Sequence, residues 1–187
     1  MKRSKVWVVL GAAEGLGYAA VKYLTANRQT VIAVADTCNA IFFDCCSEHL
    51  YLIHPDISDK VELTAAFKTA GINYGSIDYI INNGNYRLFH NAQLKTDQEV
   101  EKTIQSGAIS TIDLITGMLP YLRKKPQGNI INIPPQLCLA SVPDPLIALN
   151  LAAAMELFLK RLHQGLQTLD CGLKFLEPGE RLTGFKV

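Results

Sequence analysis

A glycine-rich turn between an apolar run and a helical pattern constrains the fold more than any other stretch. In the sequence VLGAAEGLG, Gly11, Gly15 and Gly17 follow the apolar run Val6–Leu10, and a helical pattern fills Gly15–Ala26. Because glycine has no Cβ, these three glycines allow a tight turn, a close approach of backbone to a pyrophosphate, and close packing of helix on strand. The helix N-terminus adds free N–H groups and a partial positive charge. The stretch therefore predicts a strand, turn and helix that hold dinucleotide phosphates.

Apolar runs and helical patterns alternate along the rest of the chain, which is typical of a parallel sheet with helices on both faces. We predict an α/β, Rossmann-type, doubly wound sheet in strand order 3-2-1-4-5-6, within a single dinucleotide-binding domain covering residues 1–187. The predicted strands are Lys5–Leu10 (its apolar part Val6–Leu10), Thr30–Ala35, Leu50–His54, Ile77–Asn82, Asn129–Ile133 and Leu173–Glu177. The predicted helices are Gly15–Ala26, Asp59–Thr69, Asp97–Leu122 and Leu146–Leu169.

Composition excludes several classes of function. The chain has 18 Lys and Arg against 17 Asp and Glu, so its charge favours neither nucleic acid nor an anionic membrane surface. Its five cysteines are odd in number and form no C-x-x-C pair, which argues against a disulfide framework or a metal site. No stretch is long and apolar enough to span a membrane. We expect a cytoplasmic protein.

An acidic residue, Asp36, directly follows the second apolar run. In a dinucleotide fold, a carboxylate at this place accepts hydrogen bonds from the adenosine ribose hydroxyls. Glu14, within the glycine turn, adds a second negative charge nearby. Because both carboxylates would repel a 2′-phosphate, NAD is favoured over NADP.

These residues resemble one family, the short-chain dehydrogenases/reductases, over nearly the whole chain. The resemblance rests on the glycine spacing, Asp56 in HPDISD, the stretch Asn82-Asn83-Gly84-Asn85, Leu119-Pro120, and Pro178-Gly179. It implies the fold of an NAD(P)-dependent oxidoreductase in which the residue at Asp56 binds the adenine amino group. The family motif N-N-A-G, here N-N-G-N, would line the cofactor crevice and steady the sheet.

The resemblance completes a set of expected cofactor-binding residues. The threonine of the family's P-G-x-x-x-T, near the nicotinamide, falls on Thr183. Leu10 departs from the family's usual threonine, and Asn85 departs from the N-N-A-G pattern. The full expected set is Gly11, Glu14, Gly15, Leu16, Gly17, Asp36, Asp56, Ile57, Asn82, Gly84, Pro178, Gly179 and Thr183.

The family's catalytic group of Asn, Ser, Tyr and Lys is missing. Its positions read Gly107, Pro135, Ala148 and Ala152. Between residues 134 and 159 there is no Tyr, Lys, Arg or His, so a shift of the alignment recovers no proton donor with a basic neighbour. A positioned acid–base group typically contributes about 10²–10⁴-fold to a rate. The composition of this stretch therefore predicts loss of dehydrogenase chemistry, and it argues against a small-molecule substrate.

A relocated proton donor is the alternative. Tyr86 and His90 follow the fourth predicted strand, at the sheet edge where ligands bind in such folds. An exposed polar loop is the simpler interpretation of these residues. The sequence also stops at Val187, before the substrate lid and seventh strand that the resemblance implies.

Three hypotheses stay open at this point. The first is a lapsed enzyme that keeps NAD and acts as a sensor, regulatory or structural subunit. The second is an active NAD-dependent oxidoreductase that uses Tyr86 or His90, and the third is a structural dimer that binds no nucleotide. The helix predicted over 146–169 is apolar almost all round in its first turns, so it needs cover on two sides. We expect a homodimer through helices 97–122 and 146–169.

Overall fold

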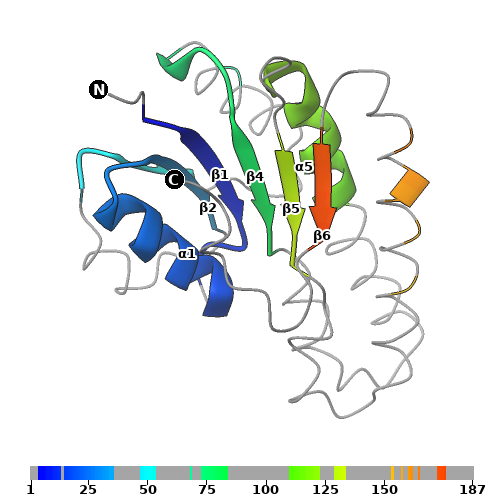
Figure 1. Ribbon diagram of the computed structural model, residues 1–187, viewed down its shortest axis with the longest axis horizontal. Helices are drawn as coiled ribbons and strands as arrows, with labels where there is room; N and C mark the ends of the chain where they lie inside the picture. The colour runs from blue at the N-terminus through cyan, green and yellow to red at the C-terminus, as the bar shows by residue number, and fades with distance from the viewer. Residues whose placement is uncertain are drawn as a thin grey trace.

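Six parallel strands form the sheet, in the order β3-β2-β1-β4-β5-β6 (Figure 1). The computed structural model describes residues 4–13, 15–35, 47–53, 68, 73–83, 110–122, 129–133, 153, 157, 160–161, 164 and 172–175. The strands are β1 (Val6–Leu10), β2 (Thr30–Val34), β3 (Leu50–Ile53), β4 (Tyr79–Asn82), β5 (Asn129–Asn132) and β6 (Gly172–Phe175). The predicted fold class and strand order are confirmed.

The central strand β1 is buried on both faces, which explains why its sequence is apolar without alternation. On one face, Val9 packs in a cluster with residues of helix α1 (Gly15–Ala26). On the other face, Val8 and Leu10 pack in a cluster with Ile115 and Met118 of helix α5 (Ser110–Met118). Figure 1 shows the two helices on opposite sides of the sheet. β1 is thereby fixed from both sides.

Helix α1 has the bounds that the sequence predicts. Its buried residues are Gly17, Ala20, Val21 and Leu24, at the three- and four-residue spacing of one helix face. The helix ends in a Schellman motif, in which the N–H of Gln29 donates to the Leu24 carbonyl at 3.0 Å. Arg28 takes the left-handed position of this motif, with φ 56°.

The predicted helix Asp97–Leu122 is described only from residue 110 onward. Helix α5 stops at Met118, and Pro120 lies in the 3₁₀ turn η3 (Leu119–Tyr121) that follows. Leu122 then pairs with Ile77 in an isolated bridge. For this reason β4 starts at Tyr79, two residues later than predicted.

The helix predicted over 146–169 is described at five scattered positions. Each of them is helical and exposed, and Leu157 is 60% exposed. These positions are Ala153, Leu157, Lys160, Arg161 and Gln164.

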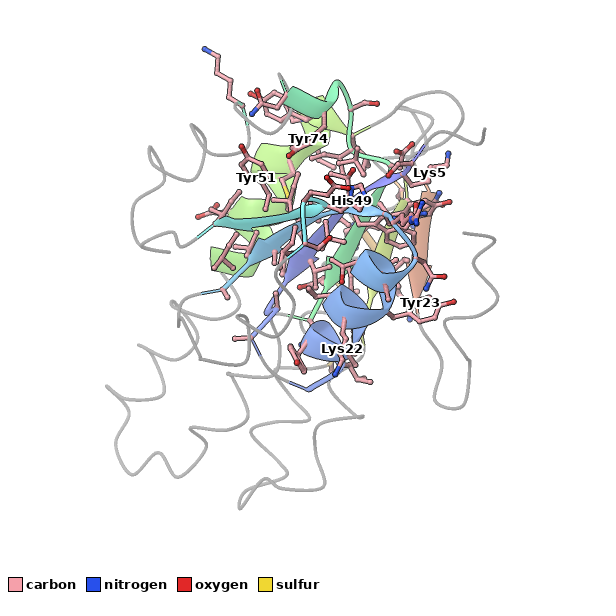
Figure 2. All side chains as sticks on the ribbon, turned by 90° about the vertical axis from the view of Figure 1, so that its left-hand side faces the viewer. Lys5, Lys22, Tyr23, His49, Tyr51 and Tyr74 are labelled. Atoms are coloured by element: carbon pink, nitrogen blue, oxygen red, sulfur yellow. The ribbon has the colours of Figure 1, made fainter. Side chains whose placement is uncertain are left out.

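Two aromatic pairs lie on opposite faces of the sheet. Trp7 of β1 stacks on Tyr79 of β4 on the α1 side, with ring centroids 4.1 Å apart and planes 15° apart. On the other side Tyr51 meets Tyr74 edge-on at 5.5 Å, and Figure 2 shows these two side by side, away from Lys22 and Tyr23 of α1. Burial, and to a lesser degree the Tyr51 hydroxyl, raises the pKa of Tyr74.

The described residues were also compared with what a membrane span or a metal site requires. Within the described ranges, no helix has the length and apolar character to cross a membrane. The same ranges contain no cluster of three or more His, Cys, Asp or Glu side chains that could hold a metal ion.

Candidate functional site

The candidate site lies where β1, β2 and β4 end side by side. Leu10 of β1 is in register with Val34 of β2 and with Asn82 of β4. The strand order reverses at β1, since β2 lies on one side of it and β4 on the other. In doubly wound sheets, ligands bind in the crevice at this reversal, outside the carboxyl ends of the strands.

The turn that leaves β1 depends on left-handed glycines. Gly11 has φ 65° and Gly15 has φ 54°, a region that costs other L-residues about 1–2 kcal/mol. Between them, Ala12 and Ala13 are buried, at 0% and 7% exposed. The Ala12 N–H donates to the Val34 carbonyl at 3.2 Å, so the turn is joined to β2.

Gly17 allows the first turn of α1 to press against this turn. A Cβ at Gly17 would lie 2.2 Å from the Gly11 carbonyl oxygen and 2.7 Å from Asn83 Nδ2. Real Cβ atoms do not approach other heavy atoms so closely, and one of the two contacts is with backbone. Of the three glycines in the motif, this one is required by close packing of helix on strand.

The end of β4 supplies two buried asparagines. Asn82 is 0% exposed and its carbonyl accepts from the Ile133 N–H at 3.0 Å, beyond β5. Asn83 is 3% exposed and its Nδ2 donates to the Gly11 carbonyl at 2.9 Å. The pair joins the glycine turn on one side to β5 on the other.

The N-terminus of α1 faces the same edge. The first four N–H groups of an α-helix have no acceptor within the helix, and the helix dipole gives this end a partial positive charge. Gly15 and Leu16 begin the helix, and Leu16 is 40% exposed although it is apolar. This arrangement suits an anionic group over the turn, with an apolar contact beside it.

The structure brings together some of the predicted site residues. Gly11, Gly15, Leu16, Gly17 and Asn82 all lie at the carboxyl ends of β1 and β4. Ala35, immediately before Asp36, is buried, and its N–H donates to the Ile53 carbonyl at the end of β3. The other predicted positions lie outside the described residues: Glu14, Asp36, Asp56, Ile57, Gly84, Tyr86, His90, Gly107, Pro135, Ala148, Ala152, Pro178, Gly179 and Thr183.

The sequence places Asn83 in a motif that lines the crevice and steadies the sheet, but it does not predict the specific bond from Asn83 to the Gly11 carbonyl. A paired Asn-Asn directly after an apolar strand was the available signal, because a buried amide needs a partner. None of the described residues at this edge carries a titratable side chain, and the positions considered for proton transfer lie outside the described residues.

Comparison with known proteins assigns the family. The model of the short chain dehydrogenase family matches residues 5–166. The chain belongs to the short-chain dehydrogenase family. Members of this family are oxidoreductases that generally bind a nicotinamide cofactor.

Curated relatives of this short-chain dehydrogenase are distant. An oxidoreductase of Botryotinia fuckeliana is 24% identical over 136 residues, which cover 70% of this chain and 48% of the relative. The 3-ketodihydrosphingosine reductase of Bacteroides thetaiotaomicron is 23% identical over 130 residues, with 70% and 48% covered. The chain spans about half the length of the curated relatives it matches.

Solved structures share the fold. A short-chain dehydrogenase from Streptomyces avermitilis superposes with a TM-score of 0.77 at 22% identity, covering 98% of this chain and 68% of the other. A 4-hydroxyisoleucine dehydrogenase solved in complex with NADH gives a TM-score of 0.73 at 20% identity, covering 94% and 75%. Solved structures of other short-chain dehydrogenases thus support the Rossmann-type arrangement of this chain.

Proposed function

We propose that this short-chain dehydrogenase relative binds NAD(H) and has lost the dehydrogenase reaction of its family. One observation carries the binding half of the proposal. The left-handed turn at Gly11 and Gly15 is packed against α1 through Gly17, which places a helix N-terminus over the strand-order reversal. Such an arrangement suits the pyrophosphate of a dinucleotide.

The preference for NAD over NADP rests on charge. Asp36 follows Ala35, whose backbone is held between β2 and β3, and Glu14 lies in the turn itself. A carboxylate at Asp36 would accept hydrogen bonds from ribose hydroxyls, whereas it would repel a 2′-phosphate. NAD is therefore the proposed ligand.

The loss of chemistry rests on side chains that are missing. In the family's reaction, a bound reduced nicotinamide would transfer a hydride to the carbonyl carbon of a substrate. The alkoxide that this leaves needs a proton donor within hydrogen-bond reach. Ala148 and Ala152 have no ionisable atoms, and Pro135 has neither a hydroxyl nor a backbone N–H to hold the substrate oxygen. The proposed role is that of an NAD-responsive sensor, regulatory subunit or structural partner.

Calorimetric titration with NADH, NAD and NADPH tests the binding. We expect the dinucleotides without the 2′-phosphate to bind more tightly, and Asp36→Ala to weaken NAD binding by about 1.5–3 kcal/mol, the loss of a charge-assisted contact. Glu48→Ala is the matched control, because it removes a carboxylate whose side chain is 88% exposed at the start of β3. Equal affinity for NAD and NADP would contradict the assignment of Asp36 and Glu14.

A hydride-transfer screen over alcohols and ketones tests the loss of chemistry. We expect turnover close to background in the wild-type protein. Steady turnover that disappears in Tyr86→Phe or His90→Ala would instead support an active oxidoreductase with a relocated donor. The triple variant Ala148→Tyr, Ala152→Lys and Pro135→Ser restores three of the family's four groups, and any gain in its rate over the wild type measures what those three contribute.

We further propose that the protein is a homodimer through helices 97–122 and 146–169. The exposed Leu157, one turn after the exposed Ala153, supports an apolar patch on the second helix that a second copy would cover, and the exposed positions that follow it are Lys160, Arg161 and Gln164. Sedimentation at micromolar concentration tests this, and a monodisperse monomer would contradict it.

A further inference from the structure

The sole Asn-Gly step of the chain is formed by Asn83 and Gly84. The backbone nitrogen of a residue can attack Cγ of a preceding asparagine and close a succinimide ring. Glycine in the second position favours this reaction, because it has no Cβ to obstruct the approach and its backbone adopts conformations closed to other residues. The family motif N-N-A-G has alanine here, so the Asn-Gly step belongs to this chain and not to the motif.

The atom that would leave in this reaction is Asn83 Nδ2, and the fold holds it in place. Nδ2 donates to the Gly11 carbonyl at 2.9 Å, and Asn83 is 3% exposed. A Cβ at Gly17 would lie 2.7 Å from Nδ2, so the first turn of α1 packs directly on this nitrogen. The nitrogen therefore cannot depart as ammonia until the glycine turn and the start of α1 move away from it.

The main chain of Asn83 is held as well. Its N–H donates to the Leu10 carbonyl at 3.2 Å, which continues the pairing of β4 with β1 past the last registered residues. Ring closure must bring Cγ within bonding distance of the Gly84 nitrogen, and hydrogen bonds to Leu10 and Gly11 restrict the rotations that this requires. The reaction therefore proceeds from a locally opened state of the protein.

We propose that Asn83-Gly84 is a deamidation site, closed while the glycine turn is packed and open when the turn loosens. The Gly84 nitrogen forms a bond to Asn83 Cγ, the Cγ–Nδ2 bond breaks, and the proton of the Gly84 N–H leaves with Nδ2 as ammonia. Water then opens the ring at one of its two carbonyls, which leaves aspartate or isoaspartate at position 83. No electrons are transferred, and water is the sole co-reactant.

Either product removes the amide donor that faces Gly11. Aspartate would set a carboxylate oxygen against the Gly11 carbonyl oxygen in a buried place, which is unfavourable. Isoaspartate would add one atom to the main chain directly after β4. The consequence for the ligand rests on the proposed NAD(H) binding: a bound dinucleotide would hold the turn closed and preserve the site, whereas modification of the ligand-free protein would end binding irreversibly.

Incubation of the ligand-free protein at mildly alkaline pH, followed by peptide mass mapping, tests the site. Asn27 and Asn73 are internal controls, because both are exposed but are followed by the bulky residues Arg28 and Tyr74. We expect Asn83 to be modified faster than either of them, despite its burial. A rate at Asn83 no higher than at the two controls would overturn the inference.

Two further incubations test whether the glycine turn controls the reaction. Saturating NADH should slow modification of Asn83, and urea sufficient to unfold the protein should speed it, because opening is required. The fraction of chains that lose NADH binding in calorimetry should equal the modified fraction. An unchanged rate in either incubation would overturn the control by the turn, and NADH binding retained by modified protein would overturn the consequence for the ligand.

Gly84→Ala is the matched variant, since it adds a Cβ beside the attacking nitrogen and leaves Asn83 and Gly11 in place. In urea, where folding plays no part, we expect it to slow modification of Asn83 by about tenfold. An unchanged rate there would overturn the assignment of the site to the Asn-Gly step. If the wild-type protein binds no NADH, the proposed function falls, while the ligand-free and urea incubations still decide the deamidation site by themselves.

Discussion

The two ends of β1 differ in how their backbone groups are satisfied. At the amino end, polar side chains do this: Gln29 Oε1 accepts from the Lys5 N–H at 3.0 Å, just before the strand, and Asp78 Oδ2 accepts from the Val6 N–H at 2.9 Å. At the carboxyl end, a turn of glycines and alanines leads into a helix N-terminus. The amino end is closed by the protein itself, whereas the carboxyl end leads into a helix whose first N–H groups have no acceptor within the helix.

Left-handed backbone occurs near both ends but with different residues. Gly11 and Gly15 take it at the carboxyl end, and Arg28, which precedes the strand next to β1, takes it at the amino end. The Schellman hydrogen bonds hold Arg28 in this conformation. Arg28 thus shows that a left-handed conformation alone does not require glycine, whereas the close contact at Gly17, which is not left-handed, excludes a side chain.

The largest expected effect comes from filling the close contact at the carboxyl end. Gly17→Ala would place a methyl group against the Gly11 carbonyl, so we expect a loss of about 3 kcal/mol in the free energy of unfolding, together with loss of NADH binding. Urea denaturation followed by circular dichroism measures the first and calorimetry the second. A variant as stable as the wild type would break the distinction between the two ends.

The next effect lies at the amino end. Asp78→Ala leaves the buried Val6 N–H without its side-chain acceptor and removes a carboxylate 3.6 Å from Lys5 Nζ, whose side chain is 37% exposed. We expect a loss of about 2 kcal/mol in the free energy of unfolding, from the unsatisfied donor. Asp78→Asn retains an acceptor for Val6, so it should cost clearly less in the same denaturation experiment.

A smaller effect of opposite sign is expected at Arg28. Arg28→Gly relieves a left-handed residue at the end of α1, and we expect a gain of about 1 kcal/mol in the free energy of unfolding. Ala26→Gly, two residues earlier and inside the helix, is the control and should destabilise. If Arg28→Gly also destabilises, the side chain of Arg28 makes a contribution that the backbone comparison does not include.

The smallest effect is expected at Gly117 in α5. A Cβ at this position meets nothing within 4 Å, so Gly117→Ala should stabilise the protein by about 0.5 kcal/mol through helix propensity alone. Set beside Gly17→Ala, it compares the same substitution in a helix that packs against the turn and in one that has space. Thermal or urea denaturation of both variants gives the contrast directly.

Patterns local in sequence predicted most of the fold. Val6–Leu10 and Gly15–Ala26 have the predicted bounds, because an apolar run, a glycine turn and a helical spacing are each set by neighbouring residues. The start of β4 differs because Ile77 pairs with Leu122 instead of continuing the strand. That pairing depends on where the chain returns after α5, which no local pattern contains.

The sequence predicts the glycines of the candidate site but not the hydrogen bonds that join the glycine turn to distant strands. The spacing of Gly11, Gly15 and Gly17 indicated a phosphate turn, and the structure gives the first two left-handed backbones and the third a close contact. The bond from Asn83 to Gly11 joins residues 72 positions apart, so it depends on the register of β1 against β4. Register of that kind follows from packing of the whole sheet.

The stacked pair at the middle of the sheet gives the protein a built-in optical probe. Trp7 is the sole tryptophan of the chain, is 3% exposed, and lies on the strand that runs directly into Gly11. Its indole fluorescence therefore comes from a water-free site in contact with Tyr79, and it will shift to longer wavelength when the sheet opens. Because reduced nicotinamide absorbs in the range where indole emits, quenching of this one fluorophore would report occupancy of the neighbouring turn without any added label.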